Sequence, residues 1–96
     1  MTTELTIVPG PASDGGSRLV VAGEIDMSNV SVFEDALSAT RGPLVVDLTA
    51  VEYLDSAGLN ALFTHAERLE LIVTPLLSPL MKVSGLDGLA TVRERS

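Results

Sequence analysis

The fold of this 96-residue chain is decided by one stretch, Val45-Val46-Asp47-Leu48-Thr49-Ala50-Val51-Glu52-Tyr53-Leu54-Asp55-Ser56-Ala57-Gly58-Leu59. It opens with a β-branched apolar run, which is typical of a strand buried in a parallel sheet. Asp55 or Ser56 then suits the N-cap of a helix, because a short side-chain oxygen there accepts from backbone N–H groups that lack intrahelical partners. Apolar side chains follow with helical spacing, at Leu59, Leu62, Phe63, Ala66 and Leu69. The stretch predicts a strand, a short loop and a helix that begins at an exposed hydroxyl.

The remaining sequence alternates between strand and helix patterns. Strands are expected at 5–8 and 18–22, joined by turn-forming residues. A helix over 28–40 carries a capping-box pair, Ser31 with Glu34, at its start. Further elements are expected in this order: strand 44–48, helix 56–69, strand 71–74, helix 78–84 and strand 90–93. Alternating βα units predict an α/β domain, with a mostly parallel sheet of four to five strands, an N-terminal antiparallel hairpin and helices packed against the sheet.

Charge and composition narrow the class of partner. Thirteen acidic residues against six basic ones give a formal charge of −7, so the phosphate backbone of a nucleic acid would be repelled. We therefore expect no nucleic-acid binding and a basic partner. The chain has no cysteine, which excludes a disulfide framework and a thiolate metal site. We expect no cofactor.

No segment has the pattern of a targeting or membrane element. The N-terminal residues lack the charged and apolar regions of a signal peptide. The most apolar stretch, 69–83, is interrupted by two prolines and by charged residues, which argues against a spanning helix of about 20 residues. The sequence predicts a cytoplasmic protein that does not insert into membranes.

Catalysis and metal binding find little support in the sequence. A catalytic serine would need the single histidine, His65, as the general base for Ser56. The two residues are nine positions apart on one predicted helix, which separates them by roughly 13 Å. Three aspartates at predicted strand ends resemble the acidic metal pocket of a phosphoacceptor receiver: Asp26, Asp47 and Asp55. The lysine that would complete such a pocket is missing, since Lys82 falls in the last helix. We expect neither an enzyme nor a metal site.

Three motifs together resemble the STAS domain family, and within it the bacterial anti-sigma factor antagonists. The first is Asp47-Leu48 followed by Leu54-Asp55-Ser56-Ala57-Gly58-Leu59. The second is Gly23-Glu24-Ile25-Asp26 after an apolar strand, and the third is Val83-Ser84-Gly85-Leu86. Their order from Leu19 to Val92 follows the family, so the resemblance implies a single STAS domain over residues 1–96.

The resemblance also implies a function and a set of residues. In such antagonists a partner anti-sigma factor, itself a serine kinase, phosphorylates the serine that follows the aspartate, which here is Ser56. The unmodified protein binds that anti-sigma factor through a face that corresponds here to Glu24, Asp26, Asp55, Ser56, Ala57, Gly58, Asn60 and Thr64. The residues alone favour a plain helix cap at Ser56, and Asp26 and Asp55 are each expected to cap a helix whatever else they do. The alternative class is a STAS accessory subunit of a bacterial lipid transport complex, which shares the loop without phosphorylation.

Two departures from the family pattern concern the periphery of the fold. Relatives place a longer helix and a glycine-containing turn before the next strand. This chain is shortened near 69–71 and passes from Glu67-Arg68-Leu69-Glu70 directly into Leu71-Ile72-Val73. Relatives also carry a further amphipathic helix after the last strand, whereas this sequence ends at Arg93-Glu94-Arg95-Ser96. Either the helix ends early, near Ala66, or the chain exchanges elements with a second copy. We therefore expect a possible homodimer.

Overall fold

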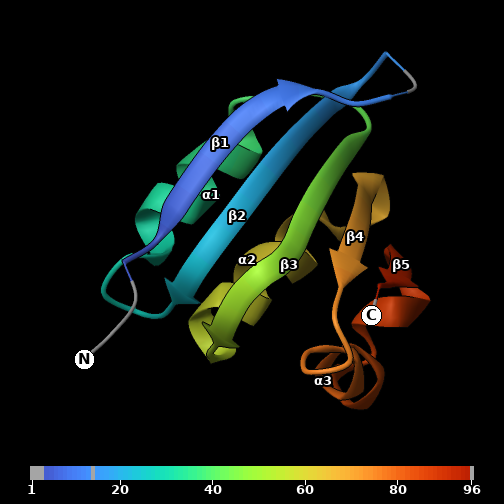
Figure 1. The fold of residues 1–96 in the computed structure, drawn as a ribbon. Coiled ribbons are helices and arrows are strands. Elements are labelled where there is room, and N and C mark those ends of the chain that lie inside the picture. The colour runs from blue at the N-terminus through green and yellow to red at the C-terminus, as the bar shows by residue number, and fades with distance from the viewer. Residues whose placement is uncertain (1–3, 14, 96) are drawn as a thin grey trace.

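Five strands form one mixed sheet within residues 4–13 and 15–95, which are the residues described by the computed structural model (Figure 1). The strands lie side by side in chain order. β1 (Thr6–Pro11) pairs antiparallel with β2 (Ser17–Ile25). The other neighbours pair in parallel: β2 with β3 (Leu44–Leu54), β3 with β4 (Leu69–Val73) and β4 with β5 (Thr91–Glu94). The predicted α/β fold, with its N-terminal hairpin and mostly parallel sheet, is confirmed.

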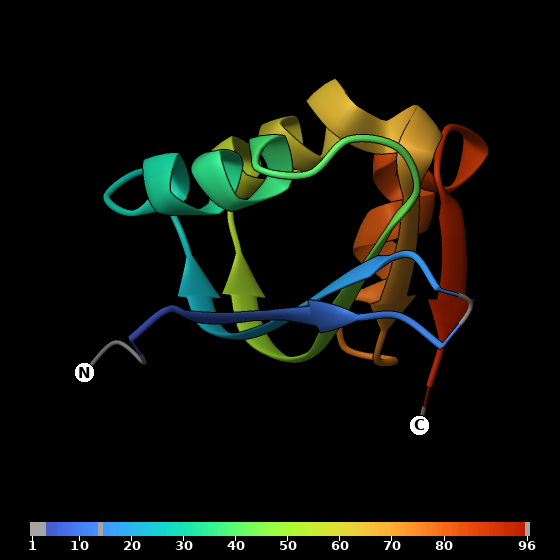
Figure 2. The same cartoon turned by 90° about the horizontal axis from the view of Figure 1, so that it is seen from above.

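Helices connect each parallel pair of strands. α1 (Val30–Ser38) follows β2, α2 (Ser56–His65) follows β3, and α3 (Ser78–Ser84) follows β4. Right-handed crossovers that always step toward the same sheet edge place their helices on one face. Figure 2 shows α1 and α2 together on one side of the sheet. Two short 3₁₀ helices, η1 (Ala66–Arg68) and η2 (Leu86–Gly88), precede β4 and β5.

The hydrophobic core lies between the sheet and these helices and is almost entirely aliphatic. Strand side chains alternate, so that one face of the sheet supplies the buried set. Its fully buried large members are Val21, Ile25, Leu44, Val46, Leu48, Leu71 and Val73 from the strands, with Phe33, Leu37, Leu62, Met81 and Leu86 from the helical segments. Because α2 packs on this core, it is a rigid support for the side chains at its N-terminus.

Helix α2 is shorter than the sequence predicted. It ends at His65, and η1 turns the chain so that β4 already begins at Leu69. The turn is closed by hydrogen bonds from the backbone N–H of Ala66 to the carbonyl of Phe63 and from that of Leu69 to the carbonyl of Ala66. Because the shortened connection reverses within its own chain, exchange of elements between protomers is not needed, and that argument for a dimer was wrong. Self-association stays a prediction that rests on exposed apolar side chains.

Two other local expectations were wrong. β1 continues through the predicted turn to Pro11, which an edge strand tolerates because a proline there has no ladder hydrogen bond to lose. The expected capping box at Ser31 does not form. Helix α1 begins after Asn29 without a side-chain cap, and Glu34 bonds to other side chains instead.

A buried carboxylate lies on the face of the sheet opposite the helices. Asp47 pairs with Arg18 at 2.5 Å, and Thr49 donates to Asp47 through its backbone N–H at 2.9 Å and its hydroxyl at 2.6 Å. Burial by itself raises the pKa of Asp47, but the hydrogen bonds from Thr49 and the Arg18 guanidinium outweigh it and hold that pKa below its ordinary value. Asp47 is therefore a structural anion in the middle of β3.

The core assignment of α2 predicts unequal effects for two of its residues. Leu62 is fully buried, whereas Thr64 is exposed on the same helix. Leu62→Ala should lower the free energy of unfolding by about 2 to 5 kcal/mol, because it opens a cavity under the helix. Thr64→Ala should change it by less than about 0.5 kcal/mol. Denaturant titrations measure both, and equal midpoints would show that the helix faces are misassigned.

Candidate functional site

The candidate site lies where β2 and β3 end, at the carboxyl edge of the parallel strands. β2 ends at Ile25 and β3 at Leu54, and the two loops that follow are joined by a backbone hydrogen bond of 3.1 Å from Asp55 to the carbonyl of Ile25. Two irregularities in the pairing of β2 with β3 set this end, one of them at Gly23, whose φ of 97° suits glycine. The strand ends thus bring the Asp26 and Asp55 loops together.

Asp55 is the N-cap of α2. The sequence had offered Asp55 or Ser56 for this position. Its Oδ1 accepts from the backbone N–H groups of Ala57 at 2.9 Å and Gly58 at 3.1 Å. Its Oδ2 accepts from the backbone N–H of Met27 at 3.2 Å, across to the neighbouring loop. One carboxylate therefore fixes both the start of the helix and the position of the second loop.

Ser56 is left free by this arrangement. It is the first residue of α2 and is exposed, and its hydroxyl makes no hydrogen bond with the described residues. It stands at the helix N-terminus, where the backbone dipoles favour a negative group. A hydroxyl that is accessible, unpaired and held on a rigid helix end is geometrically suited to modification by a partner enzyme.

The neighbouring loop is ordered by its own side chains. Asp26 Oδ1 accepts from the backbone N–H of Ser28 at 2.9 Å and from its hydroxyl at 2.5 Å. These hydrogen bonds hold the pKa of Asp26 below its ordinary value, and the one from the Ser28 hydroxyl has the largest effect. The group stays ionised at neutral pH. Asn29 Oδ1 accepts from the backbone N–H of Asp26, and Asn29 Nδ2 donates to the carbonyl of Glu24, both at 2.9 Å. The sequence analysis missed Asn29, although a turn-forming residue between strand and helix was the available signal.

Gly58 sits where α2 approaches the strand ends most closely. A Cβ placed there would lie 2.5 Å from Leu54 Cδ1 and 2.8 Å from Ile25 Cγ2. Both distances are too short for real contacts, and the branched Ile25 side chain has little freedom to move. Gly58 therefore has a packing role, because the absence of a side chain lets the start of α2 lie close against the sheet.

The other predicted residues divide between two shallow depressions. One is a groove of about 300 Å³ between α1 and α2, lined by Val30, Ser31, Glu34, Ala57, Asn60, Ala61 and Thr64. It brings together three of the predicted partner-binding residues and adds Glu34, which the sequence had placed in a cap. The other depression has about 270 Å³ and is lined by Glu4, Leu5, Glu24, Asp26, Ser28, Asn29 and Val32. Glu24 and Asp26 thus line a different depression from Ala57, Asn60 and Thr64.

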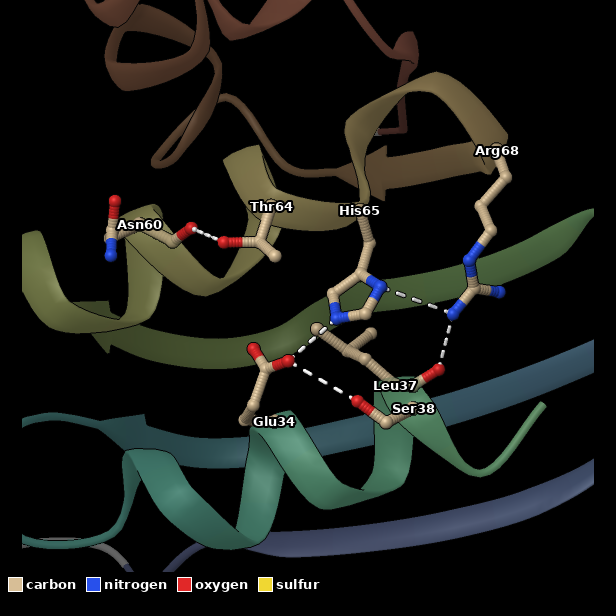
Figure 3. Close-up of polar contacts among 7 residues, drawn as sticks. All are labelled: Glu34, Leu37, Ser38, Asn60, Thr64, His65 and Arg68. Carbon is tan, nitrogen blue, oxygen red and sulfur yellow. Dashed lines mark hydrogen bonds and ion pairs between the residues drawn. The ribbon is translucent and has the colours of Figure 1, made fainter. Parts of the chain in front are cut away.

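The receiver-like acidic pocket does not assemble. Asp47 lies in the middle of β3 and is bound to Arg18, away from Asp26 and Asp55 at the sheet edge. In residues 4–13 and 15–95 no group of three or more His, Asp or Glu side chains is arranged to hold a metal ion. At the other end of α2 from Ser56, His65 bonds to Glu34 and Arg68 (Figure 3).

Comparison with known proteins agrees with this geometry. The family model described as "Mlab, STAS domain" matches residues 11–92. An anti-sigma factor antagonist from Mycobacterium paratuberculosis has a similar structure, with a TM-score of 0.81 and 29% identity over 93% of this chain and 85% of its own. No curated protein matches.

Two further solved structures support the fold alone. A STAS-domain antisigma-factor antagonist from Rhodobacter sphaeroides gives a TM-score of 0.53 at 18% identity, over 72% of this chain and 84% of its own. A protein of SpoIIAA-like fold from Shewanella loihica gives 0.60 at 12% identity, over 100% of this chain and 89% of its own.

This chain belongs to the STAS domain family, because the family model covers most of its length. The fold, with its capped α2 and the serine after the cap, is the architecture that the sequence motifs had indicated. Among the described helices none is long and apolar enough to cross a membrane.

The close approach at Gly58 predicts the effect of adding one methyl group. Gly58→Ala should lower the free energy of unfolding by about 1 to 2 kcal/mol, since overpacking costs more than the helix propensity of alanine returns. Gly88→Ala is the matched control, because a Cβ there meets nothing within 4 Å. Denaturant midpoints measure both variants. A Gly58→Ala protein as stable as the wild type would contradict the packing role.

Proposed function

We propose that this chain is an anti-sigma factor antagonist, and that phosphorylation of Ser56 by the anti-sigma factor, a serine kinase, switches its binding off. The observation that carries the proposal is the exposed, unpaired hydroxyl of Ser56 directly after the capping Asp55. The similar structure of the antagonist from Mycobacterium paratuberculosis supports the same class. The role is one of binding in the bacterial cytoplasm, with no enzymatic activity of its own.

The proposed binding face combines the two loops at the sheet edge with the exposed side of α2. Asp26 and Asp55 supply negative charge there, and the chain as a whole carries a formal charge of −7. Asn60 and Thr64 continue the face along the helix and are exposed. A basic surface on the anti-sigma factor is the complement that this charge favours.

Phosphorylation acts on this face through charge. A phosphate at Ser56 adds about −1.5 to −2 charges, and the N-terminus of α2 accommodates it within the free protein. The switch requires that the partner, within its otherwise basic surface, places an acidic group about 6 Å from Ser56. Each pair of like charges then costs about 0.7 to 3 kcal/mol at an effective dielectric between 80 and 20. Two added charges thus weaken the complex by roughly tenfold or more.

The switch predicts opposite results for two substitutions at Ser56. Ser56→Ala should keep partner binding and resist inactivation, while Ser56→Glu should bind at least about tenfold more weakly. Calorimetry with the anti-sigma factor measures both, and phosphopeptide mapping after incubation with ATP locates the phosphate. A phosphate on another residue, or equal affinities for the two variants, would contradict the switch.

The second candidate is an accessory subunit of a bacterial lipid transport complex. The family model favours keeping it, because its description names Mlab rather than an antagonist. This role would use the same face with Ser56 unmodified. Affinity purification with wild-type and Ser56→Glu protein separates the two functions. Only the antagonist role predicts that the wild-type protein retains an anti-sigma factor and that the Ser56→Glu variant does not.

A further inference from the structure

A hydrogen-bonded network joins α1, α2 and η1 beside the groove between the two helices (Figure 3). His65 Nε2 lies 2.7 Å from Glu34 Oε1, and Ser38 Oγ donates to the same oxygen at 3.2 Å. On its other side, Nδ1 of His65 lies 3.3 Å from an Arg68 guanidinium nitrogen. Arg68 also donates to the backbone carbonyls of Leu37 and, at 3.0 Å, Gly42.

The arginine decides the direction of these hydrogen bonds. A guanidinium only donates, so Nδ1 of His65 is the acceptor in its contact with Arg68. The ring hydrogen is then on Nε2, and His65 donates it to Glu34. Two donors, His65 and Ser38, therefore hold Oε1 of Glu34 and restrict the position of its carboxylate.

The second carboxylate oxygen of Glu34 remains available. Oε2 accepts no hydrogen bond from the described residues, and the Glu34 side chain is 38% exposed. Of the described residues that line the groove, Glu34 alone is charged. The nearby cation, Arg68, is committed to two backbone carbonyls and to His65. The groove thus presents a fixed negative charge with one free oxygen.

We propose that Glu34 is a recognition residue, and that the groove between α1 and α2 receives a basic side chain, lysine or arginine, from the protein partner. The inference rests on the proposed function, because Ala57, Asn60 and Thr64 of the same face line this groove. Charge complementarity identifies the occupant: among the described residues that line the groove Glu34 alone is charged, and the chain has a formal charge of −7. Because its neighbours already hold the carboxylate in place, little side-chain freedom is lost when the cation binds.

The test uses the isotope-labelled protein with two small probes of matched shape. N-acetyl-arginine amide carries the guanidinium, and N-acetyl-citrulline amide replaces it with a neutral urea group. We expect the arginine probe to shift the amide resonances of Ser31, Ala57, Asn60 and Thr64 saturably. The citrulline probe should bind at least about tenfold more weakly.

Two variants of equal net charge separate recognition from general electrostatics. Glu34→Gln keeps an oxygen that accepts from His65 and Ser38 but removes the charge, and should weaken arginine binding at least about tenfold. Asp35→Asn changes the next residue, which is exposed and does not line the groove, and should leave the affinity unchanged within about twofold.

Either of two results would overturn the proposal: no saturable shift at the groove with the arginine probe, or equal losses in the two variants. The assay contains neither anti-sigma factor nor kinase. A negative result here therefore leaves the Ser56 switch standing, and a failed switch leaves the groove assignment standing. The amide spectra also show directly whether each variant is folded.

Discussion

The hydrogen bonds of the Asp55 carboxylate are the constraint on which the rest of the site depends. Oδ1 caps α2 through Ala57 and Gly58, and Oδ2 holds the Asp26 loop through the backbone of Met27. A charged acceptor forms stronger hydrogen bonds than a neutral one, and here a single side chain satisfies groups on two elements. Because Asp55 serves as the cap, the serine that follows it is free to face solvent.

The order of the strands places the capped start of α2 beside the loop that follows β2, so that the two form one surface. Every crossover steps the same way across the sheet, so the ends of β2 and β3 stand next to each other and α1 lies beside α2. Gly58 permits the close approach of α2 to Ile25 and Leu54. The exposed hydroxyl and the groove between the helices therefore belong to one continuous side of the molecule, while the buried Asp47 with Arg18 stabilises the opposite face of the sheet.

Much of this organisation could be predicted from the sequence, because it depends on neighbours along the chain. The cap at Asp55, the apolar face of α2 and the helix over 78–84 are local patterns, and the structure confirms them. The network of Glu34 with His65 was not predictable, since 31 residues separate the two and the contact depends on where α2 ends. The capping box does not form because α1 begins at Val30, so Ser31 lies within the helix, and Glu34 bonds to His65 on α2 instead.

Hydrogen exchange of a single amide tests the role of Asp55 most directly. In Asp55→Asn the side-chain oxygen can still accept from Ala57 and Gly58, but the amide nitrogen that replaces Oδ2 cannot accept from Met27. Exchange of the Met27 amide should become at least about tenfold faster, while exchange of the Ala57 and Gly58 amides changes little. An unchanged Met27 amide, or equal acceleration of all three, would contradict the claim that this carboxylate joins the two loops.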